Sequence, residues 1–208
     1  MRVASTISNS IPNRRDASLC LPRRVIMEFD MSSVLLNANE LKRSLGRVAH
    51  EILEAHGGAE ELVVVGVMRK GYPVAKRLAW TMTQVEGNTV PCGKLDTRRY
   101  RDDHKSDEEP DESEIPFEVS GRTVILVDEV IFTGRTIRAA MDALMKYGRP
   151  KKIQLAVVID RGHRELPIQP DYYVRKIQTE FHDHVVVKLA EVDGEDGVYL
   201  ESSTPVPV

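Results

Sequence analysis

The residues with the clearest potential for chemistry stand in one short segment, where two acids precede a turn that contains threonine and glycine. Asp128 and Glu129 follow the apolar run 124–127, and Thr133 and Gly134 come a few residues later. Carboxylates accept hydrogen bonds from neighbouring sugar hydroxyls, whereas hydroxyl groups and the free N–H groups of a helix start bind phosphate. The segment therefore predicts a cradle for a ribose 5-phosphate, with the acids on the diol and the turn on the phosphate.

Asp128 and Glu129 are the candidate catalytic residues of this segment, and we expect both side chains to be exposed at a cleft. A strand that continues through them would point the two side chains to opposite sides, whereas a turn beginning there would bring both toward one sugar. Neither GxxxxGK[ST] nor GxGxxG occurs, which excludes these two nucleotide-binding motifs. The alternative is an ordinary strand–turn–helix unit with solvated acids. The whole predicted binding segment comprises Val124, Ile125, Leu126, Val127, Asp128, Glu129, Val130, Ile131, Phe132, Thr133, Gly134, Arg135 and Thr136.

The elements that must position this segment follow from the hydrophobic pattern. The apolar runs 63–67, 123–127 and 153–159 do not alternate, which is typical of strands buried on both faces. Apolar residues recur with helical spacing over residues 37–56 and 134–147. Alternating strands and helices predict an α/β fold with a mainly parallel central sheet flanked by helices, and ligands bind such sheets at the carboxyl ends of the strands. Shorter strands are expected at 89–95, 172–174, 185–189 and 198–200.

Two loops complete the predicted site. The loop Met68-Arg69-Lys70-Gly71 follows the first buried strand and carries two positive charges. Residues 98–114 are almost wholly charged and contain Pro110, so this stretch cannot bury enough apolar surface to order itself fully. We predict that it is a mobile lid loop.

At 208 residues, the chain is expected to form one domain over residues 23–202, with a disordered tail over 1–22 and a short tail over 203–208. The formal net charge of −3 implies no overall attraction to nucleic acid or to acidic membranes. Neither Cys20 nor Cys92 lies in a CxxC pair, which favours a reducing, cytoplasmic location.

Membrane, secretory and metal-binding roles find no support in the pattern. No apolar run approaches the length of a membrane span, and residues 1–22 lack the apolar core of a secretory signal. His182 and His184 stand two residues apart near several acids, but surface histidines beside a strand are common. No protein metal site is predicted.

Residues 24–200 resemble the bifunctional pyrimidine-operon regulator/uracil phosphoribosyltransferase family, within the type I phosphoribosyltransferases. The segment 124–136 resembles the phosphoribosyl-pyrophosphate motif of the wider group, and the block Arg161-Gly162-His163-Arg164-Glu165-Leu166-Pro167-Ile168 is specific to the family. Further matching blocks are Ala49-His50-Glu51-Ile52-Leu53-Glu54, Val90-Pro91, Leu95-Asp96, Tyr100-Arg101-Asp102-Asp103, Gly148-Arg149-Pro150 and Glu191-Val192-Asp193-Gly194-Glu195-Asp196.

The resemblance implies transfer of the phosphoribosyl group from phosphoribosyl pyrophosphate to uracil, giving UMP, with Mg²⁺ chelated by the substrate. It also implies a pyrophosphate loop at Arg69, Lys70 and Gly71, a lid at Tyr100 and Arg101, and a nucleobase side at Asp160 and Arg161. Asp160 is a candidate general base by position only. The chain departs from the family pattern at Met68, Arg69 and Lys70, at Glu129 in place of a second Asp, and at Glu180 in place of a small hydroxyl residue.

A second implied activity is UMP-dependent binding of a pyrimidine-operon leader RNA. The basic positions that match the family are Arg43, Arg47, His50, His163, Arg164 and Arg175, whereas Gly46 and Gln169 depart from it. Three alternatives stay open, namely a solvated helix face, an RNA-binding regulator with weak or no catalysis, and transfer to another nucleobase. The family resemblance also implies a homodimer or a larger homo-oligomer.

Overall fold

The computed structural model describes residues 29–102 and 110–203. The predicted tail over residues 1–22 lies outside the described residues, and so do the end of the chain from residue 204 and the middle of the predicted lid loop at 103–109. The domain bounds expected from the sequence therefore stay predictions.

The centre of the fold is a five-stranded parallel sheet in the order β3-β2-β4-β5-β6. Its strands are β2 (Leu62–Val67), β3 (Cys92–Leu95), β4 (Thr123–Ile131), β5 (Lys152–Asp160) and β6 (Tyr172–Lys176). Every residue of β2 is buried, as is β4 from Thr123 to Asp128, because helices cover both faces of the sheet. The predicted α/β fold with a mainly parallel sheet is confirmed.

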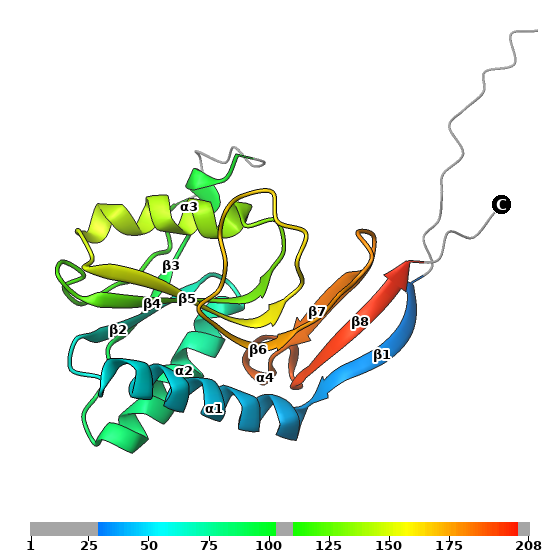
Figure 1. Ribbon diagram of the computed structural model, residues 1–208. Coiled ribbons are helices and arrows are strands. Elements are labelled where there is room, and N and C mark those ends of the chain that lie inside the picture. Colours follow the sequence, from blue (N-terminus) through cyan, green and yellow to red (C-terminus); the bar gives the residue numbers. More distant parts are fainter. Residues whose placement is uncertain (1–28, 103–109, 204–208) are drawn as a thin grey trace, which may run out of the picture.

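Helices α1 (Ala38–His56) and α2 (Gly71–Glu86) cover one face of the sheet, and α3 (Arg135–Leu144) covers the other (Figure 1). α1 begins where its sequence predicts, because the side chain of Asn37 accepts from the N–H of Glu40 at 3.0 Å and the Glu40 carboxylate accepts from the N–H of Asn37 at 2.9 Å. The helix predicted over 134–147 is shorter: α3 ends at Leu144 and a 3₁₀ turn, η2 (Met145–Tyr147), continues the chain.

A smaller antiparallel sheet lies beside the parallel one (Figure 1) and has the order β1-β8-β7. Its strands are β1 (Phe29–Asn37), β8 (Gly197–Ser203) and β7 (His184–Lys188), and α4 (Ala190–Asp193) connects the last two along the chain. Val187 and Val198 are buried in the same apolar cluster as side chains of α1 and α2. The small sheet therefore shares the core of the larger one.

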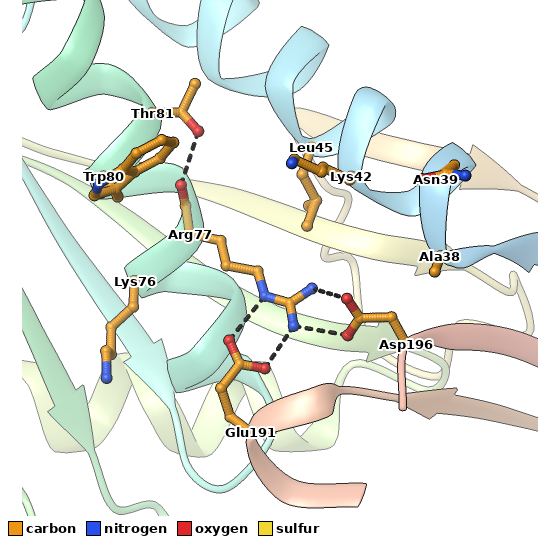
Figure 2. A pocket seen from close by; sticks show the side chains of 10 residues that line it. All are labelled: Ala38, Asn39, Lys42, Leu45, Lys76, Arg77, Trp80, Thr81, Glu191 and Asp196. Carbon is orange, nitrogen blue, oxygen red and sulfur yellow. Dashed lines mark hydrogen bonds and ion pairs between the residues drawn. The ribbon is translucent and has the colours of Figure 1, made fainter. Parts of the chain in front are cut away.

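Arg77 of α2 joins the two parts of the fold. Its guanidinium group contacts the carboxylates of Glu191 and Asp196 at once, with nitrogen–oxygen distances of 2.5 and 2.7 Å (Figure 2). The hydrogen bonds from Arg77 hold the pKa of Glu191 below its usual range. In the part of the chain that the structure describes, no helix is long and apolar enough to cross a membrane.

Candidate functional site

The acid pair lies at the carboxyl end of β4, within the strand. β4 continues through Asp128 and Glu129 to Ile131, so no turn begins at the acids. The two carboxyl groups nevertheless lie close together, because a side-chain hydrogen bond joins them. Asp128 is only 5% exposed, which corrects the expectation that both acids are exposed, while Glu129 is half-buried. The N–H of Glu129 donates to Oδ1 of Asp128 at 2.9 Å.

Burial has an electrostatic consequence for this pair. Burial of Asp128 disfavours its charged form. Together with the adjacent charge of Glu129, burial raises the pKa of Asp128 well above the usual range of an aspartate. A carboxylate with this shift ionises readily only when a donor or a cation reaches it. Such a group suits a ligand that brings hydroxyl donors.

The turn after β4 is shaped for an anion. Gly134 has a left-handed backbone (φ 92°) and caps the start of α3, so the helix begins directly beside the turn. Phe132, Thr133, Gly134 and Thr136 line a hollow of about 320 Å³. The N–H groups and the positive dipole end of α3 give this hollow the character of a phosphate site.

A loop from the next strand lies behind this turn. The N–H of Arg161 donates to the carbonyl of Ile131 at 3.1 Å, and the N–H of Glu165 donates to the carbonyl of Thr133 at 3.0 Å. Between them, the guanidinium of Arg164 donates to the carbonyl of Phe132 at 2.8 Å. Three successive carbonyls, those of residues 131–133, thus accept hydrogen bonds from the loop at residues 161–165.

The predicted lid residues lie over α3 next to the hollow. Arg101 donates to Oγ1 of Thr136 at 3.0 Å, and Arg138 of α3 donates to the carbonyl of Tyr100 at 2.5 Å. Arg135 forms ion pairs with Asp102 and Glu165, at 2.5 and 2.6 Å. The described start of the charged loop therefore contacts the predicted phosphate turn.

The loop predicted to bind pyrophosphate approaches the acids from β2. A Cβ atom at Gly71 would lie 2.5 Å from the carbonyl oxygen of Val127 and 2.9 Å from Cα of Asp128, so only glycine allows this approach. Arg69 is exposed, whereas Nζ of Lys70 donates to the carbonyl of Val187 at 2.7 Å and pairs with Asp193 at 3.0 Å. The structure brings Gly71 to the acids and connects Lys70 to the small sheet.

The residues predicted on the nucleobase side are both engaged within the protein. Asp160 is 2% exposed, and its Oδ1 accepts from the N–H of Gly162 at 3.0 Å and from Arg164 at 2.6 Å. Arg161 stacks over the ring of Phe132 at 4.0 Å and donates to Oγ1 of Thr179 at 3.0 Å. These contacts tie the end of β5 to the turn after β4.

The basic residues predicted to contact RNA do not form one uniform group. Arg43, Arg47 and His50 are exposed on α1, and Arg47 also donates to the carbonyl of Val174 in β6 at 3.1 Å. Arg175 and His163 are exposed as well. Arg164 differs, because its side chain is only 12% exposed and pairs with Asp160. Arg164 is therefore not part of an exposed basic surface, contrary to the expectation from its sequence block.

A second hollow, of about 610 Å³, lies between α1 and α2 next to Glu191 and Asp196 (Figure 2). Lys42 and Trp80, the latter 64% exposed, line it, and none of the predicted site residues does so. Among the residues that the structure describes, no group of three or more His, Cys, Asp or Glu side chains gathers as a metal site.

Comparisons with known proteins agree with this geometry. Residues 32–191 match the phosphoribosyl transferase domain. The bifunctional protein PyrR of Pelotomaculum thermopropionicum is 52% identical over 169 residues, which covers 80% of this chain and 93% of the relative. PyrR of Deinococcus radiodurans is 50% identical over 171 residues, with 81% and 93% covered. The chain belongs to the PyrR group of phosphoribosyltransferases.

Solved phosphoribosyltransferase structures share the fold at low sequence identity. A hypoxanthine phosphoribosyltransferase from Staphylococcus aureus aligns with a TM-score of 0.62 at 17% identity and covers 85% of this chain and 94% of that one. A hypoxanthine phosphoribosyltransferase of Trypanosoma cruzi gives a TM-score of 0.62 at 17% identity, with 83% and 98% covered. Identities this low show the fold alone.

One feature of this phosphoribosyltransferase escaped sequence reasoning. The rings of Phe132, His163 and Phe181 gather with centroid distances of 5.4 to 5.8 Å, at the point where Arg161 covers Phe132. Phe181 is 57% exposed and follows Glu180 in the segment that departs from the family pattern. In the sequence, only the aromatic character of Phe181 could have indicated this cluster, and Phe181 is far along the chain from the segment 124–136.

Proposed function

We propose that this protein is a uracil phosphoribosyltransferase that forms UMP and pyrophosphate from uracil and phosphoribosyl pyrophosphate. The observation that carries the proposal is the order of groups along one turn. Two acids at the end of a buried strand are followed by Thr133, Gly134 and the start of α3 around a hollow of about 320 Å³. The membership in the PyrR group supports the choice of uracil.

The sugar phosphate is proposed to bind along this turn. The 5-phosphate accepts hydrogen bonds from the backbone of residues 133–136 and from the Thr136 hydroxyl, while Asp128 and Glu129 accept from the ribose diol. Diol donors favour the ionised carboxylate and so oppose the effect of burial on Asp128. Substrate binding is thereby coupled to the release of a proton from the acid pair.

The leaving pyrophosphate is proposed to lie between the loop at residues 69–71 and the lid residues Tyr100 and Arg101. Arg69 and Arg101 supply positive charge that this leaving group needs, and Lys70 adds to it only after leaving its ion pair with Asp193. Gly71 supports the assignment, because its close approach to Asp128 brings the loop next to the proposed diol site. Lid closure over the substrate is part of the proposal.

Mg²⁺ is proposed to arrive with phosphoribosyl pyrophosphate. Glu129 and Asp128 offer carboxylate oxygens at the edge of the cradle, and Mg²⁺ prefers oxygen ligands shared between one or two carboxylates and substrate phosphates. When bound, the ion supplies positive charge against the pyrophosphate oxygens. The residues present therefore fit this substrate-borne cofactor.

In the transfer itself, a bond forms between N1 of uracil and C1 of the sugar while the bond from C1 to the pyrophosphate oxygen breaks. The pyrophosphate leaves with the electron pair of that bond and takes up the proton that N1 loses. Asp160 and Arg161 are proposed to border the nucleobase. Asp160 already accepts hydrogen bonds from Gly162 and Arg164. We therefore propose that it supports the loop beside the nucleobase and does not act as a general base.

RNA binding is a second proposed activity, because the relatives are named bifunctional and three basic side chains are exposed along α1. The proposed contacts to a pyrimidine-operon leader RNA are Arg43, Arg47, His50, Arg175 and His163, with UMP as the effector. A cytoplasmic location and a homodimer or larger assembly complete the proposal by analogy with the family.

The deciding experiment is a panel of nucleobases assayed with phosphoribosyl pyrophosphate and Mg²⁺. Uracil is expected to give the highest kcat/KM for nucleotide formation. Preference for hypoxanthine or another base would replace the proposed substrate. UMP-dependent RNA binding without detectable transfer to any base would favour a regulator without catalysis.

A further inference from the structure

The loop behind the phosphate turn arranges backbone dipoles in one direction. The carbonyls of Ile131, Phe132 and Thr133 all accept hydrogen bonds from residues 161–165. A peptide group is planar with its C=O and N–H on opposite sides, so the N–H groups that follow these carbonyls point the other way. An anion needs N–H groups toward it and carbonyls away from it.

Arg164 is the side chain that completes this arrangement. Its guanidinium donates to the carbonyl of Phe132 at 2.8 Å, of Gly162 at 3.0 Å and of Ile168 at 2.9 Å. A bond of 2.6 Å to Asp160, which is itself 2% exposed, holds it in place. A planar guanidinium can serve several acceptors in fixed directions, which an ammonium group cannot do.

We infer that Arg164 is a positioning residue of the phosphate cradle: by holding the carbonyl of Phe132 toward the interior, it keeps the following N–H of Thr133 directed at the 5-phosphate. This inference rests on the proposed function and assigns a role to the part of the sequence that otherwise suggests an RNA contact. The backing loop also packs Leu166 and Ile168 against Gly134, each 3.6 Å from where a Cβ would stand. Arg164 acts through the turn and does not itself touch the substrate.

The test measures binding of two substrate fragments to Arg164→Met and Arg164→Lys by calorimetry. Ribose 5-phosphate probes the cradle, and pyrophosphate probes the loop at residues 69–71. Both variants are expected to bind ribose 5-phosphate about 10- to 100-fold more weakly, as for a lost hydrogen bond to a charged group, with pyrophosphate affinity unchanged. Thermal unfolding of each variant is recorded in parallel.

Arg164→Lys decides the matter if Arg164→Met unfolds, because lysine keeps the charge beside Asp160 but cannot serve the three carbonyls. Wild-type ribose 5-phosphate affinity in a folded Arg164→Lys or Arg164→Met would overturn the inference and leave the proposed function intact, all the more if RNA binding were lost. If the wild-type protein bound neither fragment, the proposed function itself would be wrong.

Discussion

At the scale of single residues, Thr136 joins the proposed phosphate site to the lid. Its Oγ1 accepts from Arg101 at 3.0 Å, which leaves the hydroxyl hydrogen available to a phosphate oxygen. Thr136→Val keeps the shape and removes both interactions. We expect binding of phosphoribosyl pyrophosphate to weaken by about 1.5–3 kcal/mol, the usual loss for a hydrogen bond to a charged group, measured by calorimetry.

A matched control for this prediction is Thr81→Val. Thr81 lies on α2, its hydroxyl donates to the carbonyl of Arg77 at 2.9 Å, and it lines the second hollow instead of the cradle. This variant should keep the affinity for phosphoribosyl pyrophosphate. Equal affinities in Thr136→Val and the wild type would remove Thr136 from the binding site.

Asp128 leads to a prediction about pH. Because burial raises its pKa in the folded protein, the stability linked to Asp128 is fully present below the ordinary aspartate pKa of about 3.9 and is lost as the pH rises through the folded value. Asn cannot ionise, so Asp128→Asn should unfold at a higher temperature than the wild type near neutral pH. The difference should shrink as the pH falls toward 4.

The same variant should bind phosphoribosyl pyrophosphate more weakly, because an amide is a poorer acceptor for the diol than a carboxylate. Melting temperatures measured across the pH range, without ligand, give the first readout, and calorimetry gives the second. A melting difference that does not change with pH would contradict the raised pKa. A stabilised variant with full affinity would argue against Asp128 as a diol ligand.

Sequence reasoning predicted these site residues because the strand, the acids and the turn are contiguous. It did not foresee the burial of Asp128, which depends on β2 and β5 flanking β4. Nor did it separate Arg164 from the exposed basic residues. The Arg164 side chain points inward because it donates to the backbone carbonyls of Phe132 and Ile168. Backbone carbonyls are present at every residue, so a sequence pattern cannot show which of them a side chain will bind.

At the scale of elements, continuous apolar runs predicted β2, β4 and β5, whereas β1 was missed. Its pairing with β8 has register shifts between Met31 and Ser33 and between Val34 and Leu36. Such bulges interrupt the period of two by which a half-buried strand is identified. The sequence similarly gave no hint that Glu191 of α4 and Asp196 after it bind Arg77, since these partners are over a hundred residues from Arg77 in the chain.

Arg77 allows a test of how the small sheet is attached. Its side chain is 23% exposed and pairs with Glu191 and Asp196, so Arg77→Met leaves two carboxylates without their partner. We expect a loss of about 1–3 kcal/mol in the free energy of unfolding, because these are partly buried bonds between charged groups. Amide hydrogen exchange should also speed up in β7 and β8 more than in β4.

Lys151→Met is the matched control for Arg77→Met. Lys151 pairs with Glu61 at 2.6 Å, but the two side chains are 61% and 65% exposed. A surface pair of this kind contributes less than about 1 kcal/mol. Comparable losses in both variants would mean that Arg77 does not attach the small sheet in any special way.

At the scale of the whole molecule, the catalytic cradle and the proposed RNA contacts on α1 occupy different surfaces, whereas His163 lies against Phe132 of the cradle. The cradle lies at the carboxyl end of β4 and at the start of α3, whereas Arg43 and Arg47 lie on α1, which covers the opposite face of the sheet (Figure 1). The net charge of −3 gives no general attraction to RNA, so any binding must come from a local basic surface. The two activities should therefore respond to different substitutions.

We expect the triple variant Arg43→Gln, Arg47→Gln, Arg175→Gln to lose affinity for the leader RNA in the presence of UMP while it keeps the kcat/KM for UMP formation. RNA affinity sums many phosphate contacts. Each lost contact should therefore reduce the steepness with which log K falls with log salt concentration, by about 0.7 for a single strand, or about 2 for all three.

The charge-matched control replaces Arg149, Lys151 and Lys152 with glutamine; these residues are exposed at the amino end of β5. Both variants have the same net charge, so a purely global effect would weaken RNA binding equally in the two. An unchanged salt slope in the first variant would exclude these three arginines from the RNA surface, whereas a loss of transferase activity would show that the two functions share residues after all.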